Sequence, residues 1–211
     1  MTMKLNRTTA TRSILVFILL GSGTFSHAQR LDVFGGLSMS GFNHKIAGAK
    51  QDNSGTVNFH AGMGVFVPFK PKDYKSTEDG SGFFPSLQFV NKGTTKSTIV
   101  SVTQADVKLG YLQLNLPLTF MGGNYGIGLG PYAAYAISGT KKFRTGSNTD
   151  KQSIDFAKDI KRFDYGVSID MILGVFKIQY DLGLANIGTG VNGAVKTRNF
   201  SLGLEIPLVT N

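Results

Sequence analysis

Residues 111–138 read YLQLNLPLTFMGGNYGIGLGPYAAYAIS, and this stretch decides the fold because it contains two alternating segments joined by a short connection. In residues 111–120, leucine or phenylalanine occupies every even position, and polar residues, tyrosine or proline occupy the odd ones. Residues 124–138 alternate again, with apolar residues at the odd positions from Tyr125 to Ile137. Successive side chains of a strand point to opposite faces of a sheet, so each segment predicts a strand with one apolar and one polar face.

The same period of two recurs along the chain and predicts eight strands in all. Two of the strands, at residues 31–42 and 83–92, alternate less cleanly than the others. The remaining four are predicted at residues 56–67, 163–173, 176–184 and 198–208. The composition agrees, because 27 Gly, 16 Phe and 7 Tyr in 211 residues favour strands and turns over long helices.

The connections between these segments alternate in length. Short turns are predicted at 121–123 and around Leu173-Gly174, whereas the long connections occupy residues 43–55, 93–106, 139–161 and 185–196. Residues 68–82 break the rule and are interpreted as an insertion on the short-turn side. An even number of antiparallel strands with short turns at one end is typical of transmembrane barrels. We therefore predict an all-β fold, an eight-stranded antiparallel up-and-down transmembrane β-barrel.

Alternation alone does not say which face points inward, because a soluble lipocalin-like barrel would enclose its apolar face around a ligand. Three features favour an apolar exterior. The polar faces are rich in glycine, which suits a narrow interior, and aromatic residues of the apolar faces lie near strand ends, as interfacial girdles do. The apolar sets also extend over about 9 to 13 residues, which is enough to cross a bilayer at a tilt.

Charged residues on the polar faces predict a network inside the barrel. With Leu173-Gly174 as the turn, Ile172 would lie opposite Val175 and Met171 opposite Phe176. Asp170 would then lie opposite Lys177. We expect these two residues to form a lumen charge network with three further acids, Asp164, Asp181 and Glu205. Gln113 and Tyr132 are expected to fill the bore beside them.

The N-terminus has the layout of a secretory signal peptide. Lys4, Arg7 and Arg12 precede the apolar run SILVFILL at 13–20, and the small-residue stretch GSGTFSHA follows. We predict a cleaved signal peptide at 1–28 and a barrel domain at 29–211. The alternative, an uncleaved anchor, is disfavoured because an eight-residue apolar core is too short to span a bilayer. Cleavage lowers the net charge from +9 to +6.

Four segments resemble successive strand motifs of the PorT-like outer-membrane barrel proteins of Bacteroidetes-type bacteria. They are GFFPSLQFVNKGTTKS (82–97), YLQLNLPLTF (111–120), YGIGLGPYAAYAISG (125–139) and FKIQYDLGLANI (176–187). The most specific match is made by Tyr180, Gly183, Leu184, Asn186 and Ile187. The resemblance implies an outer-membrane location and an eight-stranded barrel, with an association of one named member with protein secretion.

Residues for catalysis or cofactor binding are sparse. The chain has no Cys, which excludes a Cys nucleophile, and His44 and His60 are the histidines beyond the predicted signal peptide. We expect His44 in a solvated loop and His60 on the polar face, where Ser38 or Ser86 could approach it as a nucleophile. The preferred interpretation of His60 is a hydrogen-bonded lumen histidine. We expect no metal and no cofactor.

The predicted loop at 139–162 is strongly basic. Lys141, Lys142, Arg144 and Lys151 are its candidate contacts to the phosphates of lipopolysaccharide. A short helix is possible at residues 153–160. The expected partners are outer-membrane lipid, lipopolysaccharide and secretion or envelope proteins, and no nucleic acid, because the basic residues lack an aromatic-interleaved motif.

These observations predict a noncatalytic outer-membrane barrel with a side-chain-filled lumen, acting through its loops in envelope structure, adhesion or support of a secretion machine. Eight strands leave space inside only for side chains. The alternatives are a narrow porin-like channel, a lumen hydrolase that uses His60, and a soluble lipocalin-like ligand-binding barrel.

Overall fold

The computed structural model describes residues 30–46, 49–50, 54–69, 80–97, 105–145, 148–156, 158–189 and 194–209. Its strands are β1 (Arg30–Ile46), β2 (Ala49–Lys50), β3 (Ser54–Pro68), β4 (Gly80–Phe83), β5 (Ser86–Ser97), β6 (Ala105–Asn115), β7 (Leu118–Gly122), β8 (Tyr125–Thr145), β9 (Asn148–Ser153), β10 (Phe163–Leu173), β11 (Phe176–Gly183) and β12 (Ala194–Val209). None of the described segments is a helix long and apolar enough to cross a membrane. The predicted signal peptide at 1–28 lies outside the described residues.

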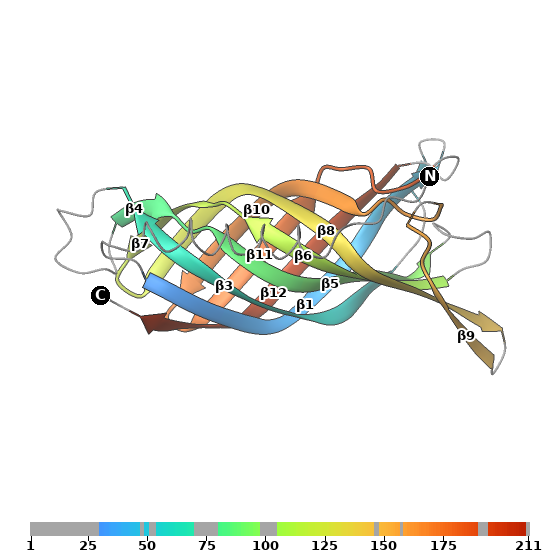
Figure 1. Ribbon diagram of the computed structural model, residues 1–211, viewed down its shortest axis with the longest axis horizontal. Helices are drawn as coiled ribbons and strands as arrows, with labels where there is room; N and C mark the ends of the chain where they lie inside the picture. The colour runs from blue at the N-terminus through green and yellow to red at the C-terminus, as the bar shows by residue number, and fades with distance from the viewer. Residues whose placement is uncertain are drawn as a thin grey trace, which may run out of the picture.

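Eight of the strands close into a ring in which every pair is antiparallel. The order around the ring is β1, β3, β5, β6, β8, β10, β11 and β12, and β12 pairs with β1 to close it. Strands that follow one another in the chain are neighbours in the ring, as in an up-and-down barrel (Figure 1). The predicted eight-stranded antiparallel barrel is therefore confirmed.

Prolines divide two of the predicted strands near the short-turn end. β4 and β5 are separated at Phe84-Pro85, and β6 and β7 at Leu116-Pro117, because proline has no N–H for the ladder. The two halves still continue the wall, since β4 pairs with β3 and β7, and β7 pairs with β8. Of the predicted insertion, residues 70–79 lie outside the described part of the chain.

Both short turns begin later than predicted, by two residues for the first and by one residue for the second. Gly122 pairs with Tyr125 across Gly123-Asn124, and Leu173 pairs with Phe176 across Gly174-Val175. The first turn residue is in each case a glycine in the left-handed region, with φ of 58° and 63°. Glycine has no Cβ and adopts this conformation at no steric cost, so the glycine sets the position of the turn.

This shift corrects the predicted register of the second hairpin. Asp170 lies opposite Gln179, and Lys177 lies opposite Ile172, so Asp170 and Lys177 are not a cross-strand pair. The faces are nevertheless as predicted, because the partner changes by two residues and side chains alternate with a period of two.

The apolar faces of the strands point outward and the polar faces inward. On β8, Tyr125 is 66% exposed and Ile127 56%, whereas Gln113 on the inner face of β6 is 0% exposed. Glycine makes space inside the ring, since a Cβ at Gly166 would lie 2.8 Å from the Tyr132 ring. The lipocalin-like arrangement, with its apolar face inward, is therefore wrong.

Several strands extend beyond their predicted limits at the long-loop end. β6 begins at Ala105 instead of 111, and β12 at Ala194 instead of 198. The predicted loop at 139–161 also contains strand, because β9 folds back on β8 as a ribbon that projects beyond the barrel (Figure 1). Residues 153–160 form no helix in their described part, where the backbone N–H groups of Lys158 and Asp159 bond to the carbonyl of Asp155 in one turn.

Candidate functional site

The interior of the barrel is the candidate functional site because it contains many buried charged and polar side chains. The five residues of the predicted charge network all lie on the inner face, each no more than 6% exposed: Asp164, Asp170, Lys177, Asp181 and Glu205. They do not form one network. Four of them belong to three clusters along the barrel axis, and Asp170 lies apart from these, beside Ser168.

The first cluster lies near the short-turn end, where β1 begins and β12 ends. Lys177 on β11 donates to Glu205 on β12 at 2.7 Å. Arg30 bonds to Asp32 through Nε at 2.8 Å, and its Nη2 lies 3.6 Å from Glu205. Two aromatic rings flank the ammonium group of Lys177, at 4.1 Å for Phe34 and 4.5 Å for Phe84. Two cations thus neutralise two carboxylates, and cation–π contacts replace water around the lysine.

The second cluster surrounds the carboxylate of Asp181. It accepts hydrogen bonds from three amide groups, at 2.7 Å from Gln179, 3.1 Å from Gln113 and 3.2 Å from Asn199. The donors come from β11, β6 and β12, so this carboxylate joins opposite walls of the barrel. Neutral amide donors thus satisfy the oxygens of this buried carboxylate.

The third cluster is centred on Asp164. Its Oδ2 atom accepts hydrogen bonds from Lys92 at 3.0 Å, from Thr197 at 2.8 Å and from the Tyr132 hydroxyl at 3.2 Å. The Lys92 ammonium also lies 4.4 Å from the Tyr132 ring centre and 5.3 Å from that of Tyr111. The side chains of Lys92 and Asp164 are 0% exposed, so this ion pair is fully buried.

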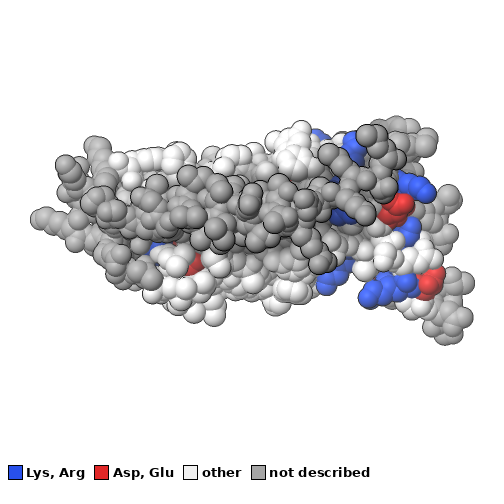
Figure 2. Space-filling model, viewed as in Figure 1, with Lys and Arg blue, Asp and Glu red and all other residues white. Residues whose placement is uncertain are grey.

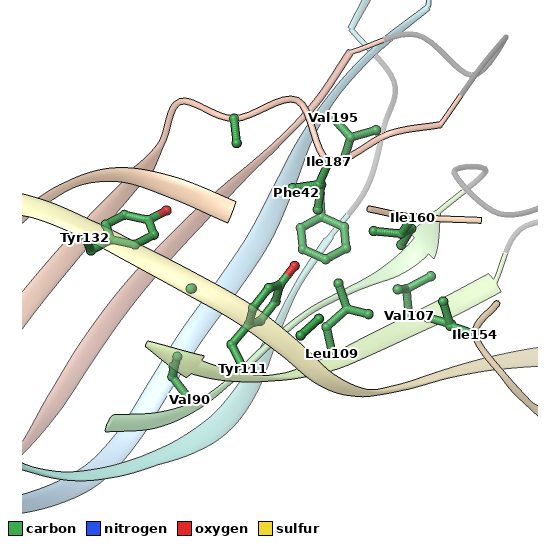
Figure 3. Packing of buried hydrophobic residues seen from close by; sticks show 13 residues of the cluster. Phe42, Val90, Val107, Leu109, Tyr111, Tyr132, Ile154, Ile160, Ile187 and Val195 are labelled. Carbon is green, nitrogen blue, oxygen red and sulfur yellow. The ribbon is translucent and has the colours of Figure 1, made fainter. Parts of the chain in front are cut away.

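An apolar cluster, called the apolar plug below, lies beyond the third cluster on the long-loop side. It includes Phe42, Val107, Leu109 and Val195 from the strands, and Ile154, Ile160 and Ile187 from the connections (Figure 3). Backbone hydrogen bonds hold the connections in place, from Lys161 N to Ile187 O at 2.8 Å and from Ile187 N to Val195 O at 2.9 Å. Ile160 and Ile187 are both 0% exposed.

The predicted pair of Asp170 and Lys177 is replaced by other contacts. Lys177 pairs with Glu205. The carboxylate of Asp170 lies 3.5 Å from the hydroxyl of Ser168 on the same strand. Lys92 was not predicted as a partner of these acids, although one signal in the sequence indicates it. Every second residue from position 84 faces inward, as Phe84, Ser86 and Gln88 do. The same period of two along β5 places Lys92 on the inner face.

His60 is buried on the inner face of β3, 3% exposed, with its ring centre 6.4 Å from that of Phe34. Its Nδ1 atom and the Ser38 hydroxyl have no hydrogen-bond partner in the described part of the chain, and Ser86 accepts a bond from Asn115. Among the described residues, therefore, no serine is hydrogen-bonded to His60. His44, expected in a solvated loop, is instead buried on β1.

The four basic residues predicted to contact lipopolysaccharide lie in different environments. Lys141 is drawn inward and pairs with Asp159 at 3.0 Å. Lys142 and Lys151 are exposed and lie opposite each other on β8 and β9. The side chain of Arg144 lies outside the described residues. On the face drawn in Figure 2, the visible lysine and arginine side chains gather mainly at the end from which β9 projects.

A family model described as an outer membrane protein beta-barrel domain matches residues 24–188. Among solved structures, the chain is similar to Neisserial surface protein A (NspA), with 12% identity, a TM-score of 0.47 and coverage of 83% of this chain and 96% of that chain. It is also similar to the outer membrane protein OprG from Pseudomonas aeruginosa, with 15% identity, a TM-score of 0.41 and coverage of 85% and 97%. No curated protein shows significant sequence similarity to it.

Proposed function

Because this chain belongs to the outer membrane protein beta-barrel domain family and so lies in the cell outer membrane, we propose that it is a noncatalytic barrel with a closed lumen. Its activity then resides in its loops, which serve envelope structure, adhesion or support of a secretion machine. The resemblance to PorT-like proteins supports the last of these roles. Export through a signal peptide cleaved after Ala28 is part of the same proposal.

The closed lumen is supported by two buried levels that follow each other along the barrel axis, the third cluster and the apolar plug. Lys92, Asp164, Ile160 and Ile187 are all 0% exposed, so the central side chains of both levels have no surface open to water. An ion that entered from the short-turn end would have to break a buried ion pair and then cross an apolar layer. Both steps carry a large desolvation cost.

A planar-bilayer measurement tests this proposal. The purified barrel is expected to show at most small, irregular openings. A double variant with Ile160→Ser and Ile187→Ser should raise both the frequency and the size of the openings, because it replaces the centre of the plug with small polar groups. Lys158→Ser with Lys161→Ser changes exposed residues of the same connection and serves as the control.

Stable steps on the nanosiemens scale in the unmodified protein would refute the closed lumen and favour the narrow-channel alternative. An equal rise in conductance for both double variants would show that the plug is not the barrier.

A further inference from the structure

The outer wall changes character at one level near the long-loop end of β3, β5 and β6. Below this level the outward side chains are apolar, and Phe59 and Phe89 pack with their ring centres 5.7 Å apart. Above it they are polar, beginning with Thr95 on β5 and Lys108 on β6. The Lys108 ammonium lies 5.8 Å from the Phe59 ring centre. A cationic side chain beside an aromatic ring at the edge of an apolar band is typical of a membrane boundary.

A cleft of about 170 Å³ opens in the outer wall just above this boundary. Its polar lining includes Lys108 and Lys142, the carboxylate of Asp106, and the hydroxyls of Thr56, Thr95 and Thr140. These residues come from β3, β5, β6 and β8, so four strands contribute to one concave site.

An interruption of the sheet explains why the wall is hollowed here. The pairing of β3 with β5 shifts between Gly55 and His60, where β3 carries an extra residue. The N–H of Gly93, at the edge of this gap beside Thr94, donates to the Ser40 hydroxyl of β1 at 2.7 Å. Such a bulge bends its strand and re-aims the side chains beside it.

The charges around the cleft favour an anion. Lys142 lies opposite Asp106 on β6, but it also lies opposite Lys151 on β9. Like charges that lie directly opposite each other destabilise a strand pair. An anion held by Lys108 and Lys142 would relieve this repulsion, and the threonine hydroxyls would supply neutral hydrogen bonds.

We propose that this cleft binds the phosphorylated sugar headgroup of an outer-leaflet glycolipid. Its acyl chains would lie along the apolar band that begins at Phe59 and Phe89. A polar cleft directly above an apolar wall matches both halves of such a lipid. The proposal deepens the predicted lipopolysaccharide contact and rests on the proposed function, with the long loops on the cell-surface side of the membrane. It assigns the site to the barrel wall and adds Lys108 to it.

Native mass spectrometry of the full chain in detergent tests the site with three probes: bis-phosphorylated lipid A, lipid A without phosphates, and inorganic phosphate. We expect the bis-phosphorylated lipid to bind about tenfold or more tightly than either other probe, because it alone has both the charge and the acyl chains. Lys108→Gln with Lys142→Gln should weaken its binding by about tenfold. Lys158→Gln with Lys161→Gln removes the same charge elsewhere on the loops and should leave the affinity within about twofold.

Asp106→Asn should change the affinity in the opposite direction. It removes a carboxylate from the cleft and should therefore tighten binding of the bis-phosphorylated lipid. Equal weakening by the two lysine double variants would overturn the proposal in favour of nonspecific charge attraction. Equal binding of lipid A without phosphates would also overturn it. If inorganic phosphate bound as tightly as the bis-phosphorylated lipid, the ligand of the cleft would be a free anion and the glycolipid proposal would be overturned.

The heat-dependent shift in gel mobility of each variant checks that its barrel is folded. Conductance separates this site from the closed lumen. A barrel that conducts but still discriminates the three probes would refute the closed lumen and leave the cleft assigned. A closed barrel that binds the three probes equally would refute the cleft and leave the closed lumen supported.

Discussion

The inner and outer surfaces of β10 differ although they are made by alternate residues of one strand. On the outside, Ile169 is 48% exposed and Tyr165 49%, and their surroundings are other apolar side chains along the wall. On the inside, Asp164 is 0% exposed and receives hydrogen bonds from Lys92, Tyr132 and Thr197. The outer residues need only an apolar solvent, whereas the inner ones need particular partners.

This contrast teaches that the two surfaces respond to substitution by different rules. A buried charge depends on its partner, and Lys92 and Asp164 are 72 residues apart in the chain. A residue on the lipid-facing wall depends on its depth in the bilayer, because no single contact holds it. The comparison therefore predicts strong coupling inside the barrel and a dependence on depth outside it.

The largest effect is expected from breaking the ion pair of the third cluster. Lys92→Met leaves Asp164 as an uncompensated buried charge and should lower the free energy of unfolding by about 3 to 5 kcal/mol. The double variant Lys92→Met with Asp164→Asn should recover much of this loss. Urea unfolding of the barrel in lipid vesicles measures both. Lys158→Met, which removes a cation that is 83% exposed, is the control with little effect.

If the two substitutions at 92 and 164 lowered the stability additively, the pair would not be coupled and the inner surface would follow the same rule as the outer one.

A charge on the lipid-facing wall should have the next largest effect. Ile169→Arg, toward the middle of β10, is expected to cost about 2 to 4 kcal/mol, because a cation is transferred into the hydrocarbon core. Leu173→Arg, on the same face beside the short turn, should cost about 0 to 1 kcal/mol. Unfolding in vesicles again gives both values. Equal costs at the two positions would contradict the dependence on depth.

The smallest effect concerns the corrected register at the short-turn end. In double-variant cycles, Lys177→Met should couple with Glu205→Gln by about 0.5 to 3 kcal/mol, because the two side chains form an ion pair. Its coupling with Asp170→Asn should be smaller, since Asp170 lies opposite Gln179. Stronger coupling with Asp170 would restore the register predicted from sequence.

Part of this fold could be predicted because its signal is local. The alternation of 111–138 identifies two strands and their faces without knowledge of any other residue. The same signal ends where the outward side chains become polar, and for this reason the beginning of β6 at Ala105 and the ribbon of β9 were not predicted. In β9 both faces carry polar residues, so no period of two is visible as hydrophobicity. At the start of β6 the alternation instead changes phase, because Val107 and Leu109 face inward and Asp106 and Lys108 face outward.

The candidate site was predicted in kind but not in its contacts. Asp164, Asp170 and Lys177 were expected on the inner face, where the structure places them. The pairing of Asp170 with Lys177 was wrong because one left-handed glycine, Gly174, moves the turn by one residue. Small differences in turn position change every cross-strand partner, although they leave the face of each residue unchanged.

The sequence by itself determined the number of strands, their faces and the polarity of the interior, because these depend on a period of two within each strand. Only the tertiary structure decided which lumen residues meet, which connections form the plug, and where the wall is hollowed. Closure of the barrel brings Lys92 of β5 to Asp164 of β10 and Gln113 of β6 to Asp181 of β11. Such contacts depend on the register and tilt of all eight strands together, and no single segment contains that information.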